Sequence, residues 1–264
     1  MARFVGPFKF SGNVGGYRGY WDKDLKEWIV ASKKEKNPNH NKHAPRAQEN
    51  NEEFKGVAMW SKLIRRMTDE VVYLKKGRRV GDLNAIGKKI QLMDRIGDRG
   101  KRQIESSKYN FPLIGFSFNK EYPFSSVFTD VPEISITEDR REVTLKLNDF
   151  ISHSKFNWPE KVSYFRVFLE IFELPDLVWD EDREKYNPFY FTMQKGKAVT
   201  VSEWMHVSTD PIDFQQSVAF KEGELPREKS AVVVVMGLEF ASGMDWGTPY
   251  VVKGHGTAAV VACF

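Results

Sequence analysis

The chain has little cysteine and no long apolar run. Only Cys263 among its 264 residues is a cysteine, so no disulfide forms within the chain, as expected for a protein that folds in a reducing compartment. Its first ten residues lack the apolar stretch of a secretory signal, and no run of about 18 apolar residues occurs. We therefore expect a cytoplasmic protein with no membrane partner.

Motifs for catalysis, cofactors and metals are also missing. The glycine cluster at 12–19 lacks the Gly-Lys-Ser/Thr ending of a phosphate loop, so we expect its glycines in tight turns. His40 and His43 have a spacing that suits a metal on a helix, but Pro38 and Pro45 favour a loop. The acidic run at 176–184 lacks the spacing of a calcium loop and is expected to be exposed. We expect no cofactor, no metal and no enzymatic activity.

Charge of opposite sign is concentrated in the two parts of the chain. Residues 1–110 contain 25 Lys and Arg against 13 Asp and Glu, and residues 111–264 contain 15 against 23. The small total charge of +4 is therefore a cancellation between a basic and an acidic part. Such a pattern favours contacts with an acidic protein, with nucleic acid or between copies of the chain.

The basic part has the pattern of a small α+β module. Short apolar runs alternate with glycines over 4–30, which predicts a β-hairpin or a three-stranded meander, followed by an exposed loop over 31–48. A helix is predicted from Asn50 as N-cap, with Glu53 completing a capping box, to the end at Gly77. A second, shorter helix is predicted from about Asp82, with its apolar face ending at Met93.

The acidic part has the pattern of strands. Apolar residues alternate with polar ones, and no helical pattern intervenes. We expect strands at 114–118, 134–136, 143–147, 164–174, 189–193, 199–204, 214–220, 231–240 and 257–264. The predicted fold class is α+β, with a strand-plus-two-helix module over 1–110 and an antiparallel β-sandwich, immunoglobulin-like or jelly-roll-like, over 111–264.

Two groups of residues are candidates for binding. An aromatic and basic patch stands in the glycine-rich segment, and a basic run follows the first predicted helix; together they comprise Tyr17, Arg18, Tyr20, Trp21, Lys75, Lys76, Arg78 and Arg79. Aromatic rings can stack on bases while cations meet phosphates. The alternative is that the aromatic residues pack on the first helix and the cations are solvated.

The N-terminal segments KFSGNVGGY (9–17) and RAQENNEEF (46–54), followed by KLIRR (62–66), resemble a family of uncharacterised bacterial proteins. In that family a glycine-rich strand segment precedes a helix that starts Arg-x-x-Glu-Asn-x-x-Glu-Phe. The resemblance is clearest over 1–75. It departs after Tyr20, where a basic Arg-x-Lys-Gly-Gly run is usual and this chain has WDKD. The resemblance implies an architecture and a bacterial cytoplasmic origin, and no catalytic residue.

These observations favour a non-enzymatic structural or interaction protein that forms a homo-oligomer or binds an acidic partner, because opposite charges on identical copies can pair head to tail. The alternative is a nucleic-acid-binding protein that uses the basic, aromatic N-terminal module. A carbohydrate-active enzyme is a third reading, and it requires two carboxylates that face one cleft.

Overall fold

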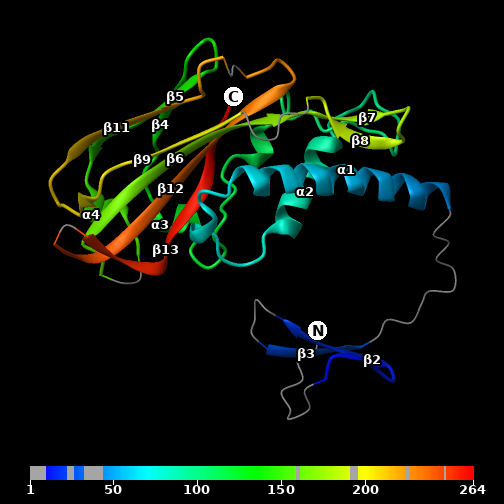
Figure 1. Cartoon of the computed structure of the whole chain (residues 1–264), viewed down its shortest axis with the longest axis horizontal. Coiled ribbons are helices and arrows are strands. Elements are labelled where there is room, and N and C mark those ends of the chain that lie inside the picture. The colour runs from blue at the N-terminus through cyan, green and yellow to red at the C-terminus, as the bar shows by residue number, and fades with distance from the viewer. Residues whose placement is uncertain are drawn as a thin grey trace. The chain divides into compact units, whose positions relative to one another are not determined.

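The computed structural model describes residues 10–22, 27–32, 44–158, 161–190, 196–223, 226–246 and 248–264. The chain divides into two compact units, Met1–Gln48 and Glu49–Phe264, which are called unit 1 and unit 2 below. All paired strands run antiparallel within the described ranges. The fold is therefore an α+β arrangement of mostly antiparallel sheets (Figure 1).

Unit 1 contains a three-stranded meander in the order β1-β2-β3, as the alternation of apolar runs and glycines predicts. Its strands are β1 (Gly12–Val14), β2 (Tyr17–Asp22) and β3 (Glu27–Ser32). Gly15 has a φ of +54° in the turn between β1 and β2, a conformation that glycine adopts without steric cost. Most of the predicted loop at 31–48, including His40 and His43, lies outside the described residues.

Two helices and two single 3₁₀ turns begin the next part of the chain: α1 (Pro45–Met67), η1 (Val72–Leu74), α2 (Val80–Gln91) and η2 (Phe111–Leu113). Both long helices were predicted, but the bounds of the first differ. It begins at Pro45, because proline suits the first position of a helix, and not at Asn50. It ends at Met67 and not at Gly77; the Thr68 hydroxyl that follows donates back to the Ile64 carbonyl at 2.9 Å.

Short helices and ten strands make up the remainder of unit 2 where the structure describes it. In chain order they are α3 (Phe124–Val127), β4 (Glu133–Ile136), β5 (Glu142–Phe150), α4 (Ser152–Lys155), β6 (Tyr164–Pro175), β7 (Leu177–Asp180), β8 (Lys185–Pro188), β9 (Lys197–Val201), β10 (Met205–His206), β11 (Ile212–Ala219), β12 (Ser230–Asp245) and β13 (Thr248–Cys263). The strands form a five-stranded sheet, β10-β6-β12-β13 with β9 also paired to β6, a three-stranded sheet β11-β5-β4, and the hairpin β7-β8.

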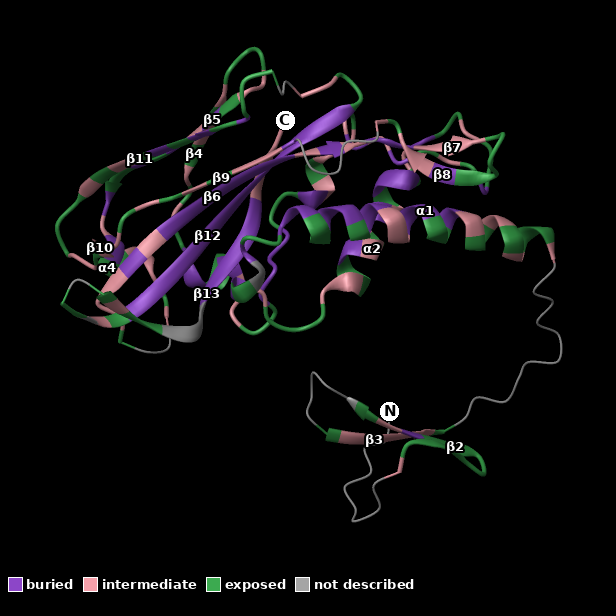
Figure 2. Ribbon diagram, viewed as in Figure 1, coloured by how far each residue is buried: buried purple, intermediate pink, exposed green. Residues whose placement is uncertain are grey.

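The five-stranded sheet is buried on both faces, as the purple ribbons of β6 and β12 show (Figure 2). One face packs against α1 and α2, for example Phe172 and Val233 with Trp60. The other face packs against the three-stranded sheet, for example Leu169 and Val234 with the residues of β5 and β11. Three layers therefore follow one another: helices, the five-stranded sheet and the three-stranded sheet. The immunoglobulin-like or jelly-roll-like class stays a prediction.

Three predicted features differ from the structure. The boundary between the two compact units lies after Gln48 and not near residue 110, because the helices share a core with β6 and β12. The predicted strand at 114–118 is not a regular strand: Gly115 has a φ of +84°, and the segment pairs with β13 only through the bridge from Ser117 to Ala259 and the hydrogen bond from the Gly115 amide to the Val260 carbonyl at 2.8 Å. The acidic run matches the expected exposed loop only in part: Glu181, Asp182 and Glu184 lie in the exposed turn between β7 and β8, but Asp176 is buried and Asp180 ends β7.

Candidate functional site

The aromatic and basic residues of β2 do not form one patch. Successive side chains of a strand point to opposite faces, so Tyr17 and Trp21 share one face of the small sheet and Arg18 and Tyr20 the other. The Arg18 guanidinium carbon lies 5.9 Å from the centre of the Tyr20 ring. The structure thus divides this predicted site into an aromatic face and a cation–π pair.

The aromatic face of unit 1 is exposed. Tyr17 is 58% and Trp21 46% exposed, and Trp21 meets Trp28 of β3 edge to face with ring centres 5.7 Å apart. Within the described part of β1–β3 only Gly19 is buried, because Phe10 packs on it so closely that a Cβ would lie 2.4 Å from the Phe10 carbonyl oxygen. The aromatic rings are therefore available to a partner and are not a core.

Lys75 is held by the protein itself. Its Nζ donates to the Thr68 hydroxyl at 2.7 Å and to the Thr68 carbonyl, which the end of α1 leaves without a helical partner. Burial lowers the pKa of Lys75 to about 8. Lys75 therefore acts as a structural cap and is a poor candidate for contact with phosphate.

The other residues of the basic run are nearer the surface. Lys76 forms an ion pair with Glu121 at 2.6 Å, and Arg79 forms one with Asp82 at 2.7 Å. Arg78 is exposed. These residues belong to unit 2, whereas the β2 residues belong to unit 1. The run is thus partly neutralised by acidic neighbours, which weakens it as an electrostatic site.

An apolar groove lies between α1 and β8. It has a volume of about 410 Å³, and Ala58, Met59 and Leu63 of α1 face Pro188 of β8 across it. This volume lies in the range of about 300–1,000 Å³ that is usual for ligand pockets. No residue of this groove was predicted as a site, because the groove forms only where β8 packs beside α1 and its residues match no motif.

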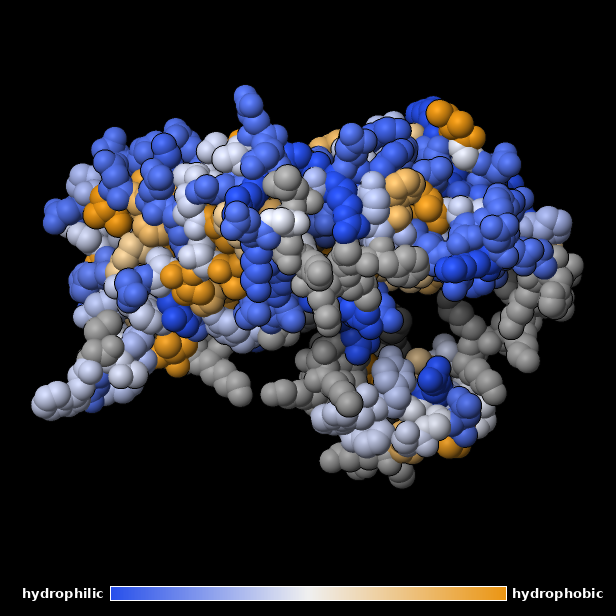
Figure 3. All heavy atoms as spheres, turned by 45° about the horizontal axis from the view of Figure 1, so that its top comes forward, coloured by the Kyte–Doolittle hydropathy of each residue, from blue (hydrophilic) through white to orange (hydrophobic). Residues whose placement is uncertain are grey.

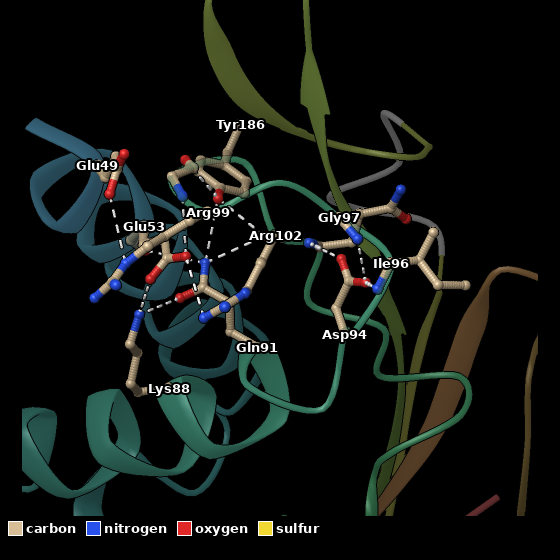
Figure 4. A network of polar contacts seen from close by, with 12 residues as sticks. Glu49, Glu53, Lys88, Gln91, Asp94, Ile96, Gly97, Arg99, Arg102 and Tyr186 are labelled. Carbon is tan, nitrogen blue, oxygen red and sulfur yellow. Dashed lines mark hydrogen bonds and ion pairs between the residues drawn. The ribbon is translucent and has the colours of Figure 1, made fainter. Parts of the chain in front are cut away.

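The helix α1 also carries a buried carboxylate. Glu53 of α1 is 2% exposed and accepts hydrogen bonds from Lys88 Nζ and, at 3.1 Å, from the Gly100 amide, while Arg102 Nη1 lies 3.7 Å away (Figure 4). Burial alone would raise the pKa of Glu53, but the hydrogen bonds from Lys88 and Gly100 outweigh it and lower the pKa. Glu53 thus remains charged and ties α1 to α2 and to the 97–102 loop.

Gln91 and Tyr186 extend this network to β8. The Gln91 amide donates to the Glu53 carbonyl at 3.2 Å and to the Tyr186 hydroxyl at 3.3 Å, and that hydroxyl donates to the Arg102 carbonyl at 2.9 Å. The Tyr186 ring lies directly on Gly56, where a Cβ would come within 2.9 Å of ring atoms. The network therefore fixes β8 against α1 and so sets the wall of the groove.

The sequence signal for this network is the position of Glu53 on the apolar stripe of α1. Glu53 was predicted to complete a capping box, but the helix begins eight residues earlier, at Pro45. Glu53 lies four residues before Val57 and seven before Trp60, on the same helical stripe. A charged residue on an apolar stripe indicates a buried and paired charge.

Two buried carboxylates lie on the helix-facing side of the central sheet. Glu170 is fully buried, with Oε1 3.1 Å from Lys197 Nζ, an ion pair outside hydrogen-bond geometry, and burial raises its pKa to about 7. Glu239 accepts from Arg166 at 2.6 Å. Glu170 pairs with Val235, four residues from Glu239 along β12, so about 13 Å separates their backbones. Each carboxylate pairs with its own cation, whereas the two carboxylates of a glycosidase face one cleft.

Three further observations bear on metals, membranes and relatives. Among the described residues, no three His, Cys, Asp or Glu side chains gather as a metal site would require. No described helix is both long and apolar enough to cross a membrane. No family model matches the chain, and no curated protein or solved structure matches it either.

The surface seen in Figure 3 is mostly hydrophilic, and hydrophobic side chains form small separate patches on it. Small patches favour recognition through local features such as a groove or a single protruding ring, and not through one broad apolar interface.

Proposed function

We propose that this chain is a non-enzymatic structural or interaction protein that self-associates, with its basic N-terminal part contacting an acidic surface of the strand-rich part of another copy. The observation that carries the proposal is the separation of charge. Unit 1 contains ten Lys and Arg against four Asp and Glu. The segments 129–150 and 209–223, which contain the three-stranded sheet, together have four Lys and Arg against nine Asp and Glu.

The alternation of β4, β5 and β11 places these acidic residues outward. Leu145 and Val218 point into the core, whereas Glu133, Glu142 and Asp213 are exposed. The outer face of this sheet is therefore a polar, negatively charged surface. Opposite charges of this kind accelerate association and fix orientation, and salt weakens them. Contact between two different surfaces of identical copies is heterologous and produces rings or open chains.

Light scattering after size exclusion of the full chain tests the proposal at about 0.05 M and about 1 M salt. We expect oligomers at low salt that dissociate, wholly or in part, at high salt. The double variant Glu133→Lys and Glu142→Lys should weaken assembly at low salt. The control Asp182→Lys and Glu184→Lys changes the charge equally at exposed positions in the β7-β8 turn, which belongs to a different sheet, and should not. A wild-type monomer at both salt concentrations would refute self-association.

Nucleic-acid binding is the second candidate, because Tyr17 and Trp21 expose their rings on one face of a basic unit. Such a face can stack on bases. The same size-exclusion run records the ratio of absorbance at 260 and 280 nm. Co-purifying nucleic acid that salt removes, with loss in a Tyr17→Ala and Trp21→Ala variant, would favour this function over self-association.

We also propose that the two facing sheets belong to the immunoglobulin-like or jelly-roll-like sandwiches, and that the protein is cytoplasmic. The shared core of the two sheets supports the first statement. The single cysteine supports the second.

A further inference from the structure

The turn of the β12-β13 hairpin carries an unusually exposed aromatic residue. Asp245 of β12 pairs with Thr248 of β13, and Trp246 directly follows Asp245 at the tip of this hairpin. Trp246 is 99% exposed, and Tyr250 and Val251, on the following strand, are 56% and 42% exposed. The hairpin therefore exposes a tryptophan ring to solvent.

The backbone of Trp246 adopts a conformation that is unfavourable for tryptophan. Its φ is +47°, in the left-handed region that costs energy for any residue with a bulky side chain. Two-residue hairpin turns strongly favour asparagine, aspartate or glycine at such a position. The fold alone gives no reason for tryptophan here, since the ring packs against almost nothing. Contact with another molecule does give a reason.

The apolar groove between α1 and β8 lies at the other end of unit 2. β12 begins at Ser230, paired with Pro175, directly before β7 and β8, and it ends at Asp245. Its 16 residues span about 50 Å. Figure 1 shows β7 and β8 at one end of the central sheet and the β12-β13 turn at the other. The hairpin tip of one copy therefore cannot reach the groove of the same copy.

Tip and groove are compatible in size and carry opposite charge. The groove volume of about 410 Å³ suits a single aromatic ring, and Met59 and Leu63 supply apolar contacts. Lys62 and Arg66 give the groove positive charge, and the residue before the tryptophan is the exposed Asp245. We infer that Trp246 of one copy inserts into the groove of a second copy, with Asp245 facing Lys62 and Arg66.

This inference rests on the proposed self-association, but it assigns a contact separate from that of the charged surfaces. Burial of one ring and its neighbours removes far less surface than a stable interface of about 1,200–2,000 Å², so we expect weak association that high protein concentration reveals. An apolar contact persists at about 1 M salt, whereas contacts between exposed charges are screened there. Salt thus separates the two contacts.

Two single variants of the full chain test the contact. Trp246→Asn removes the ring and places a residue that tolerates the left-handed conformation, so the thermal midpoint should stay equal or rise. Ala58→Glu on α1 fills the groove with an acidic side chain that repels Asp245, and glutamate is a good helix former. Sedimentation velocity from about 10 µM to about 1 mM at about 1 M salt measures association.

We expect the wild type to associate at high salt and each variant to associate at least about tenfold more weakly. A mixture of the two variants should form dimers and nothing larger, because Trp246→Asn retains a groove and Ala58→Glu retains a tip. Wild-type association at low salt only, or unchanged association of Trp246→Asn, overturns this inference and leaves the proposed function standing. Variants that stay monomeric when mixed overturn the tip-to-groove pairing. A wild-type monomer at both salt concentrations overturns both proposals.

Discussion

Replacing Glu53 by glutamine is expected to destabilise unit 2 substantially while changing almost no volume. The carboxylate is 2% exposed and binds Lys88 Nζ and the Gly100 amide. Glutamine keeps one carbonyl oxygen for the Gly100 amide but has no charge for Lys88 and Arg102, and its NH₂ group donates where an acceptor is needed. The perturbation is therefore the loss of one buried negative charge.

The magnitude follows from the exposure of the partners. Breaking a fully buried ion pair costs about 3–5 kcal/mol, because the remaining charge stays unpaired in the interior. The side chains of Lys88 and Arg102 are 38% and 27% exposed, so water compensates part of that loss. We estimate about 2–3 kcal/mol in the free energy of unfolding. For a unit of this size, that lowers the thermal midpoint by about 5–10 °C.

Thermal melting followed by circular dichroism measures the effect, and Glu52→Gln is the matched control. Glu52 is the next residue of α1 and forms a surface ion pair with Lys55 at 2.6 Å, so its loss should cost no more than about 0.5 kcal/mol. The lowered pKa of Glu53 adds a pH test. Its contribution is present above pH about 4.5 and is lost as the pH falls through the lower folded pKa. Equal midpoints for the two variants would refute a stabilising role for the buried network.

Two further predictions concern the core. Gly87→Ala on α2 should destabilise the protein by about 1–3 kcal/mol, because its Cβ would lie 2.8 Å from the Trp60 ring, whereas Gly81→Ala, with nothing within 4 Å, should be neutral or gain up to about 1 kcal/mol. Thermal shifts of the same sign would contradict this packing. Burial raises the pKa of Glu170 from 4.5 to about 7, so its contribution to stability is fully present below pH about 4.5 and is lost as the pH rises through about 7. Urea unfolding at several pH values should show this loss in the wild type and not in Glu170→Gln; parallel profiles would show that Glu170 does not titrate in this window.

Hydrophobic periodicity located most elements of unit 2. The apolar residues of α1 recur at helical spacing, and Val57, Trp60 and Ile64 are all buried as that spacing predicts. Runs of alternating apolar residues likewise located β4, β5, β6 and β11. The bounds were less predictable: β12 and β13 extend well beyond the predicted segments, since polar residues near a hairpin tip continue the ladder of backbone hydrogen bonds without an apolar pattern.

The candidate sites were predicted less well than the fold. The division of the β2 patch between two faces could be predicted from the sequence, because side chains alternate between the two faces of a strand and the segment from Tyr17 to Trp21 has a strand pattern. The role of Lys75 could not be predicted from the sequence, because Thr68 accepts its hydrogen bonds only where α1 ends. The groove between α1 and β8 and the exposed hairpin tip could not be predicted from the sequence either. Each depends on how distant segments pack, and Trp246 in a sequence has no mark that distinguishes an exposed ring from a buried one.

The sequence by itself determined the class of the fold, the order of its main helices and strands, and the separation of charge. Those properties depend on local periodicity and on residue counts, which need no knowledge of contacts. Only the tertiary structure decided that α1 and α2 share a core with the central sheet, and that Glu53 is a buried carboxylate linking α1 to α2 and not part of a helix cap. It also decided that Trp246 lies at the end of the sheet opposite the groove. These properties depend on residues far apart in the chain, as in the hydrogen bond from the Tyr73 hydroxyl to the Glu239 carboxylate, 166 residues away, and pairing at such separations is set by packing and not by local pattern.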